Sequence, residues 1–553
     1  MATEKQARLT LEELRADIVG EGACFATPFG TRRLTYADHI ASGRPLASVE
    51  EALERAVLPL YANTHTEDSA TGAHTTELTE LARAYLKRRL GGGEHHKLIF
   101  AGTGATGALK RLQEVLGVSV APHLRDRVVG MLEPRERWVV FVGPYEHHSN
   151  DVSWRESLAE RVPIPLAPDG TLDLAALERV LRDPRYLNRP RLGSFSAASN
   201  VTGLLTDVRA VARLLHEHGA LAAFDFAASA PYVRIDVSES SPGANDGLDA
   251  VALSPHKLLG GPGSTGLLLI HESLYSLSCP TTAGGGTVTF VNRDQQRYVA
   301  DVETREDAGT PGILQKLRAA MAFRVKERVG EDLIAQREEA YIRRALARLA
   351  GNPKVEVLGN LEAPRLAVVS FLVKPAGRYL HPRFVVRLLS DLFGIQGRAG
   401  CSCAGPYGHD LLGIDDATSR AYLNQIEAGY DGVRPGWCRL SFHFMIEEAE
   451  FEFLLSAIEF LADEGDAFLP LYDFDWRSGA WRHAAAPRAA EHGAGAFEPE
   501  AWAPVPTSPN AREEDFADYL AEARRLAAVL RSAPPAAPDR TTTADTGLAR
   551  FQY

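Results

Sequence analysis

Between residues 97 and 270 short apolar runs alternate with amphipathic stretches, and this alternation leaves few possible folds. Stretches such as 174–183 and 207–219 repeat their apolar residues with helical spacing. The apolar runs have the length of buried strands and lie at 97–101, 137–143, 191–196, 221–226, 249–253 and 266–270. The pattern predicts an α/β fold in which a mostly parallel sheet is covered by helices on both faces.

Polar residues with reactive or hydrogen-bonding side chains end or follow five of these predicted strands. They are Thr103, His147, Asn200, Asp225 and Lys257. Ligands of such sheets bind outside the carboxyl ends of the strands. We therefore expect these side chains to gather at one edge of the sheet.

Size and charge limit the class of protein. A chain of 553 residues exceeds what one core supports, so at least two domains are expected. The net charge of −12 argues against a nucleic-acid or anionic-membrane partner. No apolar run approaches the roughly 18–20 residues that span a bilayer. The first residues lack the layout of a signal peptide and instead predict a helix capped by Thr10 and Glu13.

The five cysteines are an odd and sparse set, at positions 24, 279, 401, 403 and 438. They do not form a disulfide framework, so a cytoplasmic location is expected. Cys401 and Cys403 stand in a CSC stretch, which fits neither a zinc knuckle nor a CxxC redox pair. No metal site is expected.

The GTGATG stretch at 102–107 follows a predicted strand and opens a helix. A dinucleotide site would also need an acidic residue at the end of the next strand. That strand ends at Gly143, much further along, and is followed by Pro-Tyr-Glu. The favoured interpretation is a cradle for one phosphate, formed by the helix N-terminus and the hydroxyls of Thr103 and Thr106.

A phosphate cradle, a strand-ending Asp225 and a later Lys257 together meet the needs of pyridoxal 5′-phosphate. This cofactor needs an anion site, a carboxylate against its ring nitrogen and a lysine that forms a Schiff base with its aldehyde. Taken singly, Asp225 is more often a turn or capping residue, and Lys257 is more often a solvent-exposed charge. Their order and spacing favour the cofactor site.

The sequence resembles the class V aminotransferases, and within them the cysteine desulfurase and selenocysteine lyase group, over roughly residues 30–465. The resemblance implies fold type I of the pyridoxal phosphate enzymes, with a seven-stranded large domain and a smaller α+β domain. The motifs that carry it are TGATGAL (103–109), EHHSN (146–150), SNVTG (199–203), FDFAAS (224–229), SPHK (254–257), GGGTV (284–288), EDAGTPG (306–312), RAGCSCAGP (398–406) and WCRLSF (437–442).

The resemblance also implies a role for each matched residue. His147 would stack on the ring, Asn200 would bind its hydroxyl, and Lys257 would carry the cofactor. Cys403 would be the reactive thiol of a mobile loop, and Arg439 would bind the substrate carboxylate. Arg398, close to Cys403 in the sequence, is expected to hold either the thiolate or the substrate carboxylate. The implied phosphate ligands are Thr103, Gly104, Ala105, Thr106, Ser254 and His256, together with Thr287 and Thr310 on loops that approach the partner's phosphate in an obligate homodimer.

Two positions depart from the family pattern. Ala228 stands where the family usually has glutamine, so one hydrogen bond to the ring oxygen is missing. The stretch 61–70 resembles the substrate-side segment and supplies Asn63 and His65, but Thr66 stands where a basic residue is common. Both departures bear on the identity of the substrate.

The expected domains are a helical N-terminal segment (1–35) packing on the small domain, a large cofactor-binding domain (36–310), and a long linking helix (about 311–350) that leads into the small domain (together 311–465). An extension (466–553) follows, with a linker at 483–510, an amphipathic helix at 511–532 and a disordered tail. The helix would place Phe516, Tyr519, Leu520, Ala523, Leu526 and Leu530 on one face.

The favoured hypothesis is a cysteine desulfurase that converts L-cysteine to L-alanine and leaves a persulfide on Cys403, for which a sulfur-acceptor protein is a possible partner. A C–S β-lyase or an aminotransferase acting in specialised metabolism would use the same cofactor with Cys403 incidental. A non-catalytic scaffold is the third alternative.

Overall fold

The computed structural model describes residues 8–485, 498, 502–508, 510, 512–533 and 541–552, and its chain divides into two compact units. The first unit holds residues 8–19, Ile40–Gln336 and Glu362–Leu366. The second holds Gly20–His39, Arg337–Leu361 and the described residues from Ala367 onward. Residues 8–19, which were expected to pack on the small domain, belong to the first unit instead, while 20–39 and the described part of the C-terminal extension belong to the second unit.

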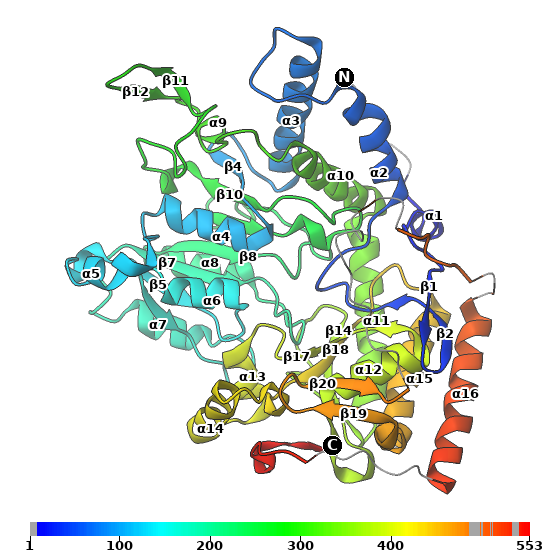
Figure 1. Ribbon diagram of the computed structural model, residues 1–553. Helices are drawn as coiled ribbons and strands as arrows, with labels where there is room; N and C mark the ends of the chain where they lie inside the picture. The colour runs from blue at the N-terminus through cyan, green and yellow to red at the C-terminus, as the bar shows by residue number, and fades with distance from the viewer. Residues whose placement is uncertain are drawn as a thin grey trace. The chain divides into compact units, whose positions relative to one another are not determined.

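A seven-stranded sheet organises the first unit (Figure 1). Its strands stand in the order β4-β10-β9-β8-β7-β5-β6, and only β10 runs antiparallel to its neighbours. Their bounds are β4 His96–Phe100, β5 Val139–Val142, β6 Glu160–Pro163, β7 Arg191–Ser196, β8 Leu221–Asp225, β9 Ala250–Leu253 and β10 Leu267–His271. The mostly parallel α/β sheet expected from the alternating pattern is confirmed.

Helices cover both faces of this sheet. Leu192 of β7 belongs to a buried cluster with Leu109 of α4 (Gly104–Val115) and Trp154 of α6 (His148–Arg155). The next residue, Gly193, faces the opposite side, where an added Cβ would meet Leu215 of α8 (Val208–Glu217). Every residue of β7 is buried, as expected for a strand covered on both faces.

The remaining helices of this unit include α3 and α10, which pack together. The bounds are α1 Leu11–Ala16, α2 Ala47–Ala52, α3 Ala70–Arg89, α5 Arg125–Val129, α7 Leu174–Leu181, α9 Val302–Arg305 and α10 Ile313–Val329, with a β11 (Val288–Val291) and β12 (Gln296–Tyr298) hairpin. Thr10 and Glu13 form the predicted capping box of α1. The long helix expected from 311 to 350 is two helices, because Gly330, at φ +94°, separates α10 from α11 (Glu331–Ala350).

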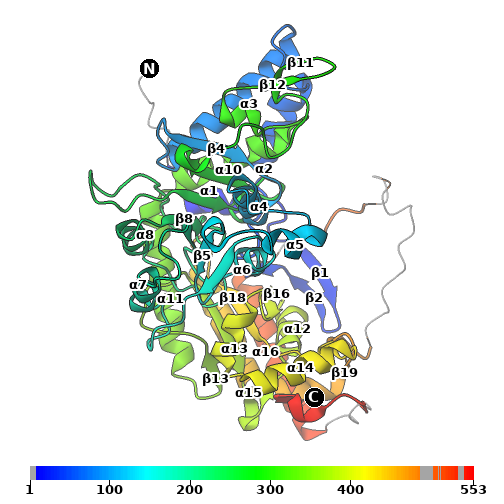
Figure 2. The ribbon, with the colours of Figure 1, turned by 90° about the vertical axis from the view of Figure 1, so that its left-hand side faces the viewer.

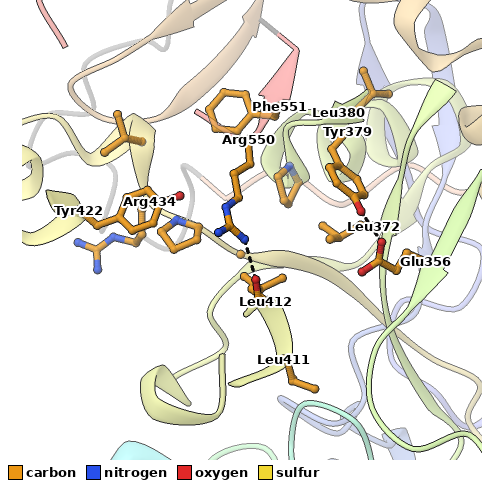
Figure 3. Close-up of a pocket in the computed structure, with 14 residues that line it drawn as sticks. Glu356, Leu372, Tyr379, Leu380, Leu411, Leu412, Tyr422, Arg434, Arg550 and Phe551 are labelled. Carbon is orange, nitrogen blue, oxygen red and sulfur yellow. Dashed lines mark hydrogen bonds between the residues drawn. The ribbon is translucent and has the colours of Figure 1, made fainter. Parts of the chain in front are cut away.

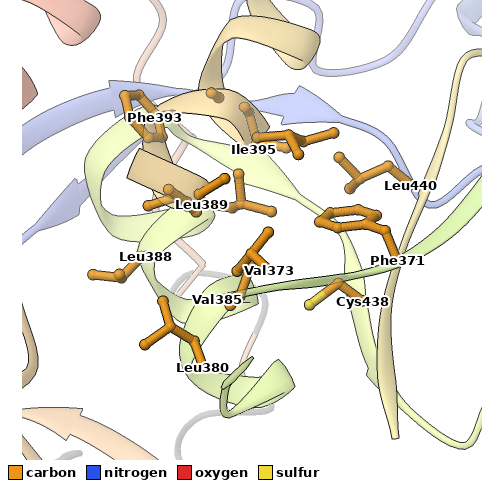
Figure 4. Packing of buried hydrophobic residues seen from close by; sticks show 14 of the residues in the cluster. Phe371, Val373, Leu380, Val385, Leu388, Leu389, Phe393, Ile395, Cys438 and Leu440 are labelled. Atoms are coloured by element: carbon orange, nitrogen blue, oxygen red, sulfur yellow. The ribbon is translucent and has the colours of Figure 1, made fainter. Parts of the chain in front are cut away.

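A four-stranded sheet, in the order β13-β14-β18-β17, lies in the second unit with a large apolar core. Figure 4 shows Phe371 and Val373 of β14 facing Val385 and Leu389 of α12. The bounds are β13 Val355–Val357, β14 Val368–Val373, β15 Tyr379–Leu380, α12 Pro382–Phe393, β16 Ile395–Gln396, β17 Arg398–Gly400, α13 Gly405–Leu412, α14 Asp416–Glu427, β18 Trp437–Ser441 and α15 Glu448–Glu464.

Residues 20–36 differ from the helix expected up to residue 35. They form a hairpin of β1 (Cys24–Thr27) and β2 (Gly30–Arg33), and then β3 (Thr35–Tyr36), which pairs with β16. Pro28 and Gly30, which has a φ of +104°, lie at the turn of the hairpin, where a helix cannot continue. The extended backbone that follows fixes the position of Asp38.

The C-terminal extension packs on the core of the second unit. It contains a hairpin of β19 (Tyr472–Asp475) and β20 (Ala480–His483), the helix α16 (Arg512–Ser532), and β21 (Phe551–Gln552). In α16, Phe516 stacks on Phe453 of α15, with ring centroids 4.0 Å apart. Most of the expected linker lies outside the described residues, but Pro506 accepts a hydrogen bond from the N–H of Cys24 at 2.7 Å.

The tail after residue 540 is ordered, contrary to the expected disorder, whereas 534–540 lie outside the described residues. The strand β21 pairs in parallel with β15, and Figure 2 shows this end of the chain beside α14. Tyr422 of α14 donates to the carbonyl oxygen of Leu548 at 3.0 Å. Because the backbone of the tail is paired, a polar composition does not prevent its ordering.

The tail also closes a pocket of about 120 Å³ in the second unit (Figure 3). Arg550 reaches into it and donates to the carbonyl oxygen of Leu412 at 2.6 Å. Tyr379 donates to Glu356 on another wall, and Leu372 and Leu380 give the pocket an apolar part.

Within the described ranges, no helix combines the length and the apolar character that crossing a bilayer would require.

Candidate active site

Asp225 and Lys257 lie at the carboxyl ends of neighbouring parallel strands. Asp225 is the last residue of β8, where it pairs with Ser196 of β7 and Ala252 of β9. The strand β9 ends one residue later, at Leu253, and a short 3-10 turn, Pro255–Lys257, follows it. The topology therefore brings both residues to the sheet edge that the sequence predicted.

The Asp225 carboxyl group is buried beneath this edge. Burial raises its pKa, while the N–H of Ala227, which donates to Oδ1 at 2.8 Å, and the charge of Lys257 lower it. A buried carboxylate is stable only beside a positive group. The arrangement suits a protonated ring nitrogen facing Asp225.

The N-terminus of α4 packs against the turn that carries Lys257. The N–H of Ala105 donates to Oγ of Ser254 at 2.8 Å. Gly104 has a φ of +60°, and a Cβ built on it would lie 2.6 Å from Cε1 of His256 and 2.7 Å from Oγ of Ser254. Burial, followed by the charge of Lys257, lowers the pKa of His256 to about 4, so its imidazole is neutral near pH 7. A helix N-terminus and a serine hydroxyl thus lie together, as a phosphate site requires.

The Gly104→Ala variant should therefore lose affinity for pyridoxal 5′-phosphate by at least about tenfold and be destabilised by about 1–3 kcal/mol. The added methyl group would push Ser254 and His256 away from the N-terminus of α4. Cofactor titration and thermal unfolding measure the two effects.

Gly117→Ala is the matched control, because Gly117 follows the same helix at φ +70° but an added Cβ there meets nothing within 4 Å. Equal losses in the two variants would show that backbone strain, and not the cradle, is responsible.

His147 is fixed next to the same helix terminus. It is the N-cap of α6, and its Nδ1 accepts from the N–H of Ser149 at 3.1 Å. The hydroxyls of Ser149 and Thr106 are hydrogen-bonded at 2.7 Å. Because Nδ1 is an acceptor, the proton of the neutral ring is on Nε2, which is therefore the atom able to exchange a proton with a ligand.

Glu146 anchors this segment, and the sequence analysis did not identify it. Its carboxyl group accepts from the N–H of Ser196 at 2.8 Å, from the hydroxyl of Ser196 at 2.6 Å and from Nδ2 of Asn150 at 2.7 Å. Burial raises its pKa to about 7, and the nearby charge of Asp225 also raises it. Glu146 thus ties the His147 segment to the end of β7.

The raised pKa of Glu146 predicts a pH-dependent stability. Below the unfolded pKa, about 4.5, the carboxyl group is protonated in both states, and its stabilisation is lost as the pH rises towards about 7. This loss amounts to about 3 kcal/mol. The Glu146→Gln variant should not show this loss. In urea titrations, its unfolding free energy minus that of the wild type should therefore become more positive from pH 4.5 to 7.

An exposed control for this variant is Glu339→Gln on α11, whose side chain is 75% exposed. Its curve should follow that of the wild type. Parallel curves for Glu146→Gln and the wild type would contradict the assignment.

Asn200 and Ala228 are buried close in sequence to the strand ends. Asn200 lies in the turn after β7, where Oγ of Ser199 accepts from the N–H groups of Val201 and Thr202. Ala228 is buried three residues after Asp225, and its methyl side chain cannot form a hydrogen bond.

Another group of predicted residues lies on neighbouring loops of the first unit. A Cβ at Gly286 would lie 3.2 Å from Nε2 of the exposed His65, and Gly309 donates to the carbonyl oxygen of Gly285 at 2.9 Å. Thr287 is buried and donates to Gly284 at 2.7 Å, whereas Asn63 and Thr310 are exposed. The structure thus places the loops of Asn63, His65, Thr287 and Thr310 together.

The residues of the second unit that were predicted to bind the substrate or to carry the thiol lie on β17, on β18 and in the loop after β17. Arg398 begins β17 and pairs with Arg439 of β18. Cys403 is exposed in the loop after β17, and both Ser402 and Cys403 have positive φ, at 50° and 57°. Such strained backbone is common at functional sites.

Comparisons with known proteins agree with this architecture. The class V aminotransferase family profile matches residues 35–454, and the chain belongs to this family. A probable cysteine desulfurase of Staphylococcus aureus is 28% identical over 380 residues, which cover 68% of this chain and 84% of that protein. A probable cysteine desulfurase of Halalkalibacterium halodurans is 27% identical over 410 residues, covering 73% and 92%.

Among solved structures, the apo cysteine desulfurase of Thermococcus onnurineus superposes with a TM-score of 0.65 at 25% identity, covering 83% of this chain and 99% of that one. A cysteine desulfurase of Escherichia coli, in its S-sulfonic acid form, superposes with a TM-score of 0.60 at 22% identity, covering 82% and 98%. The resemblance to the cysteine desulfurase group is confirmed, and fold type I with it.

Proposed function

We propose that the protein is a pyridoxal 5′-phosphate-dependent cysteine desulfurase that releases L-alanine from L-cysteine and keeps the sulfur as a persulfide on Cys403. The observation that carries the proposal is the position of buried Asp225 and of Lys257 at the ends of adjacent strands, next to a helix N-terminus that contacts Ser254. The named relatives support the choice of reaction.

The residues present fit the cofactor. Thr103 to Thr106, at the N-terminus of α4, would bind the phosphate with Ser254 and His256. His147, Asn200 and Asp225 would hold the ring, and Lys257 would hold it covalently. When bound, the cofactor supplies an electron sink for negative charge at the substrate Cα.

Each side chain then has a separate task. The Asp225 carboxylate holds a positive charge at the ring nitrogen, and the Lys257 amine removes the Cα proton and returns protons later. Nε2 of His147 exchanges a proton with the substrate thiol. Arg439 and Arg398 bind the substrate carboxylate through charge-assisted hydrogen bonds.

Cys403 is the proposed sulfur carrier. Its thiolate attacks the substrate sulfur, so that an S–S bond forms as the C–S bond breaks, and protonation of the carbon left behind gives L-alanine. The thiol is exposed, as transfer to an acceptor protein requires. A thiol carrier of this kind works in a reducing compartment, which favours the cytoplasm.

We also propose a homodimer. Large apolar side chains are exposed on the first unit at Leu58, Leu60, Tyr61, Phe290 and Val291. They flank the loops of His65 and Thr287. The family resemblance implies that the Thr287 loop approaches the cofactor phosphate bound by the partner subunit. Exposed apolar surface of this kind is typical of an interface.

One observation favours a second candidate, a C–S β-lyase or an aminotransferase. Ala228 is buried and apolar where the family usually has a hydrogen-bonding glutamine. The course of the reaction beyond proton abstraction depends on such contacts to the ring.

Product analysis of the purified holoenzyme with L-cysteine tests the proposal. In a single turnover, one alanine and one protein-bound sulfur per active site are expected. Pyruvate with ammonia would indicate β-elimination instead, and a 2-oxo acid without ammonia would indicate transamination.

A further inference from the structure

Asp38 bridges the two arginines expected to bind the substrate carboxylate. Its Oδ1 accepts from Nη2 of Arg439 at 2.8 Å, and its Oδ2 accepts from Nε of Arg398 at 3.0 Å. All three residues belong to the second unit. The carboxylate of Asp38 therefore makes the contacts that a substrate carboxylate would make.

Backbone hydrogen bonds fix the segment that carries Asp38. The strand β3 pairs with β16, and the N–H of Ala37 continues this pairing by donating to the carbonyl oxygen of Gln396 at 3.0 Å. The carbonyl oxygen of Ala37 accepts from the N–H of Ser441, at the end of β18, at 2.7 Å. Asp38 thus follows a residue held by two different strands, and its position is not an accident of a loose loop.

Burial and charge explain why an acidic group is needed here. Arg398 and Arg439 face each other on antiparallel strands, where like charges repel. The side chain of Arg439 is only 3% exposed, and that of Asp38 is 12% exposed. A buried guanidinium without a counter-ion would be strongly destabilising. Burial, followed by the charge of His39, lowers the pKa of His443 well below its usual value, so His443 adds no charge to the neighbourhood.

The balance of charge in this cluster is one negative against two positive groups. Arg398 is 48% exposed and is therefore the arginine that an incoming carboxylate reaches from solvent. An incoming carboxylate must either share Arg439 with Asp38 or displace Asp38 from it. Repulsion by the carboxylate of Asp38, a few ångströms away, makes the binding free energy of the incoming carboxylate less favourable.

We propose that Asp38 is a specificity-determining residue that competes with the substrate carboxylate for Arg398 and Arg439, so that the cluster favours an amino acid with a single carboxylate. This inference rests on the proposed function, because it takes the two arginines as the carboxylate site. It assigns to Asp38 a role beyond holding the strands together.

The test measures binding by calorimetry on the holoenzyme, with probes that do not need turnover. The first probe, 3-mercaptopropionate, has the thiol and carboxylate of cysteine but no amine. Asp38→Asn, which keeps the shape of the side chain and removes its charge, should bind it about tenfold more tightly than the wild type. A second probe, 2-mercaptosuccinate, carries another carboxylate. Its affinity should increase more from the wild type to Asp38→Asn than that of 3-mercaptopropionate does.

Two controls separate competition from a structural effect. Cysteamine, which has no carboxylate, should bind the variant and the wild type within about twofold. Asp38→Glu, which keeps the charge, should bind 3-mercaptopropionate no more tightly than the wild type does. Asp38→Ser repeats the first comparison if the asparagine variant folds poorly.

Unchanged or weaker binding of 3-mercaptopropionate to the uncharged variants would overturn the inference, as would an equal gain for cysteamine. Failure of the proposed function gives a different result, since it would appear as a wild-type enzyme that makes no alanine from L-cysteine.

Discussion

Replacing Lys257 with alanine is expected to remove the visible absorbance of the bound cofactor and to lower L-cysteine turnover by at least about 10³-fold. The lysine is assigned both to hold the cofactor and to transfer the Cα proton, so its replacement removes both functions at once. Absorbance spectra of the purified variant and alanine formation from L-cysteine measure the two effects.

Lys110→Ala is a suitable control, because Lys110 lies on α4, the helix of the phosphate cradle, but its side chain is 53% exposed. It should keep the spectrum and the turnover of the wild type. An unchanged absorbance band in Lys257→Ala would mean that another residue holds the cofactor.

Replacing Cys403 with serine should abolish protein-bound persulfide and lower alanine formation by about 10²-fold or more, while the cofactor spectrum stays as in the wild type. A hydroxyl is not ionised near neutral pH and is a poor nucleophile towards sulfur, whereas a thiolate is a good one. Cyanolysis of the protein after incubation with L-cysteine measures the persulfide.

The neighbouring thiol provides the matched control. Cys401 lies two residues earlier in the same loop and is partly exposed. Cys401→Ser should retain persulfide and turnover. If Cys403→Ser retained its persulfide and Cys401→Ser lost it, the carrier would be Cys401.

The central sheet was largely predictable because buried strands must be apolar on both faces. The strand at 191–196 was predicted with the bounds that β7 has, and the other five predicted strands are shifted by one or two residues. The strand that the pattern missed, β6, carries Glu160 and Arg161, and it lies at the edge of the sheet, where partial exposure permits charged side chains. Because β6 has no apolar run, the pattern of apolar runs does not predict it.

Two further misses have physical causes. The helix expected from 311 to 350 gave no sign of its break, because a glycine is tolerated within a helix and only its φ of +94° shows that Gly330 ends one. The tail at 541–552 looked disordered from its composition, but it orders through backbone pairing with β15, which composition does not encode.

Some contacts of the candidate site could also be predicted from the sequence, and others could not. Asp225 ends β8, and His147 and Lys257 lie a few residues after β5 and β9, so their position at one edge of the sheet follows from the parallel topology. The contact between Asp38 and Arg439 could not be predicted from the sequence, because 401 positions separate the two residues and the contact depends on the pairing of β3 with β16. Glu146 adjoins His147, yet its role appears only from its three hydrogen bonds to Ser196 and Asn150.

The most direct test of the account is to find the residue that carries the cofactor. Reduction of the holoenzyme with sodium borohydride, followed by peptide mass spectrometry, should place a pyridoxyl group on Lys257. A modified peptide that contains a different lysine, or no modified peptide from a protein loaded with cofactor, would contradict it.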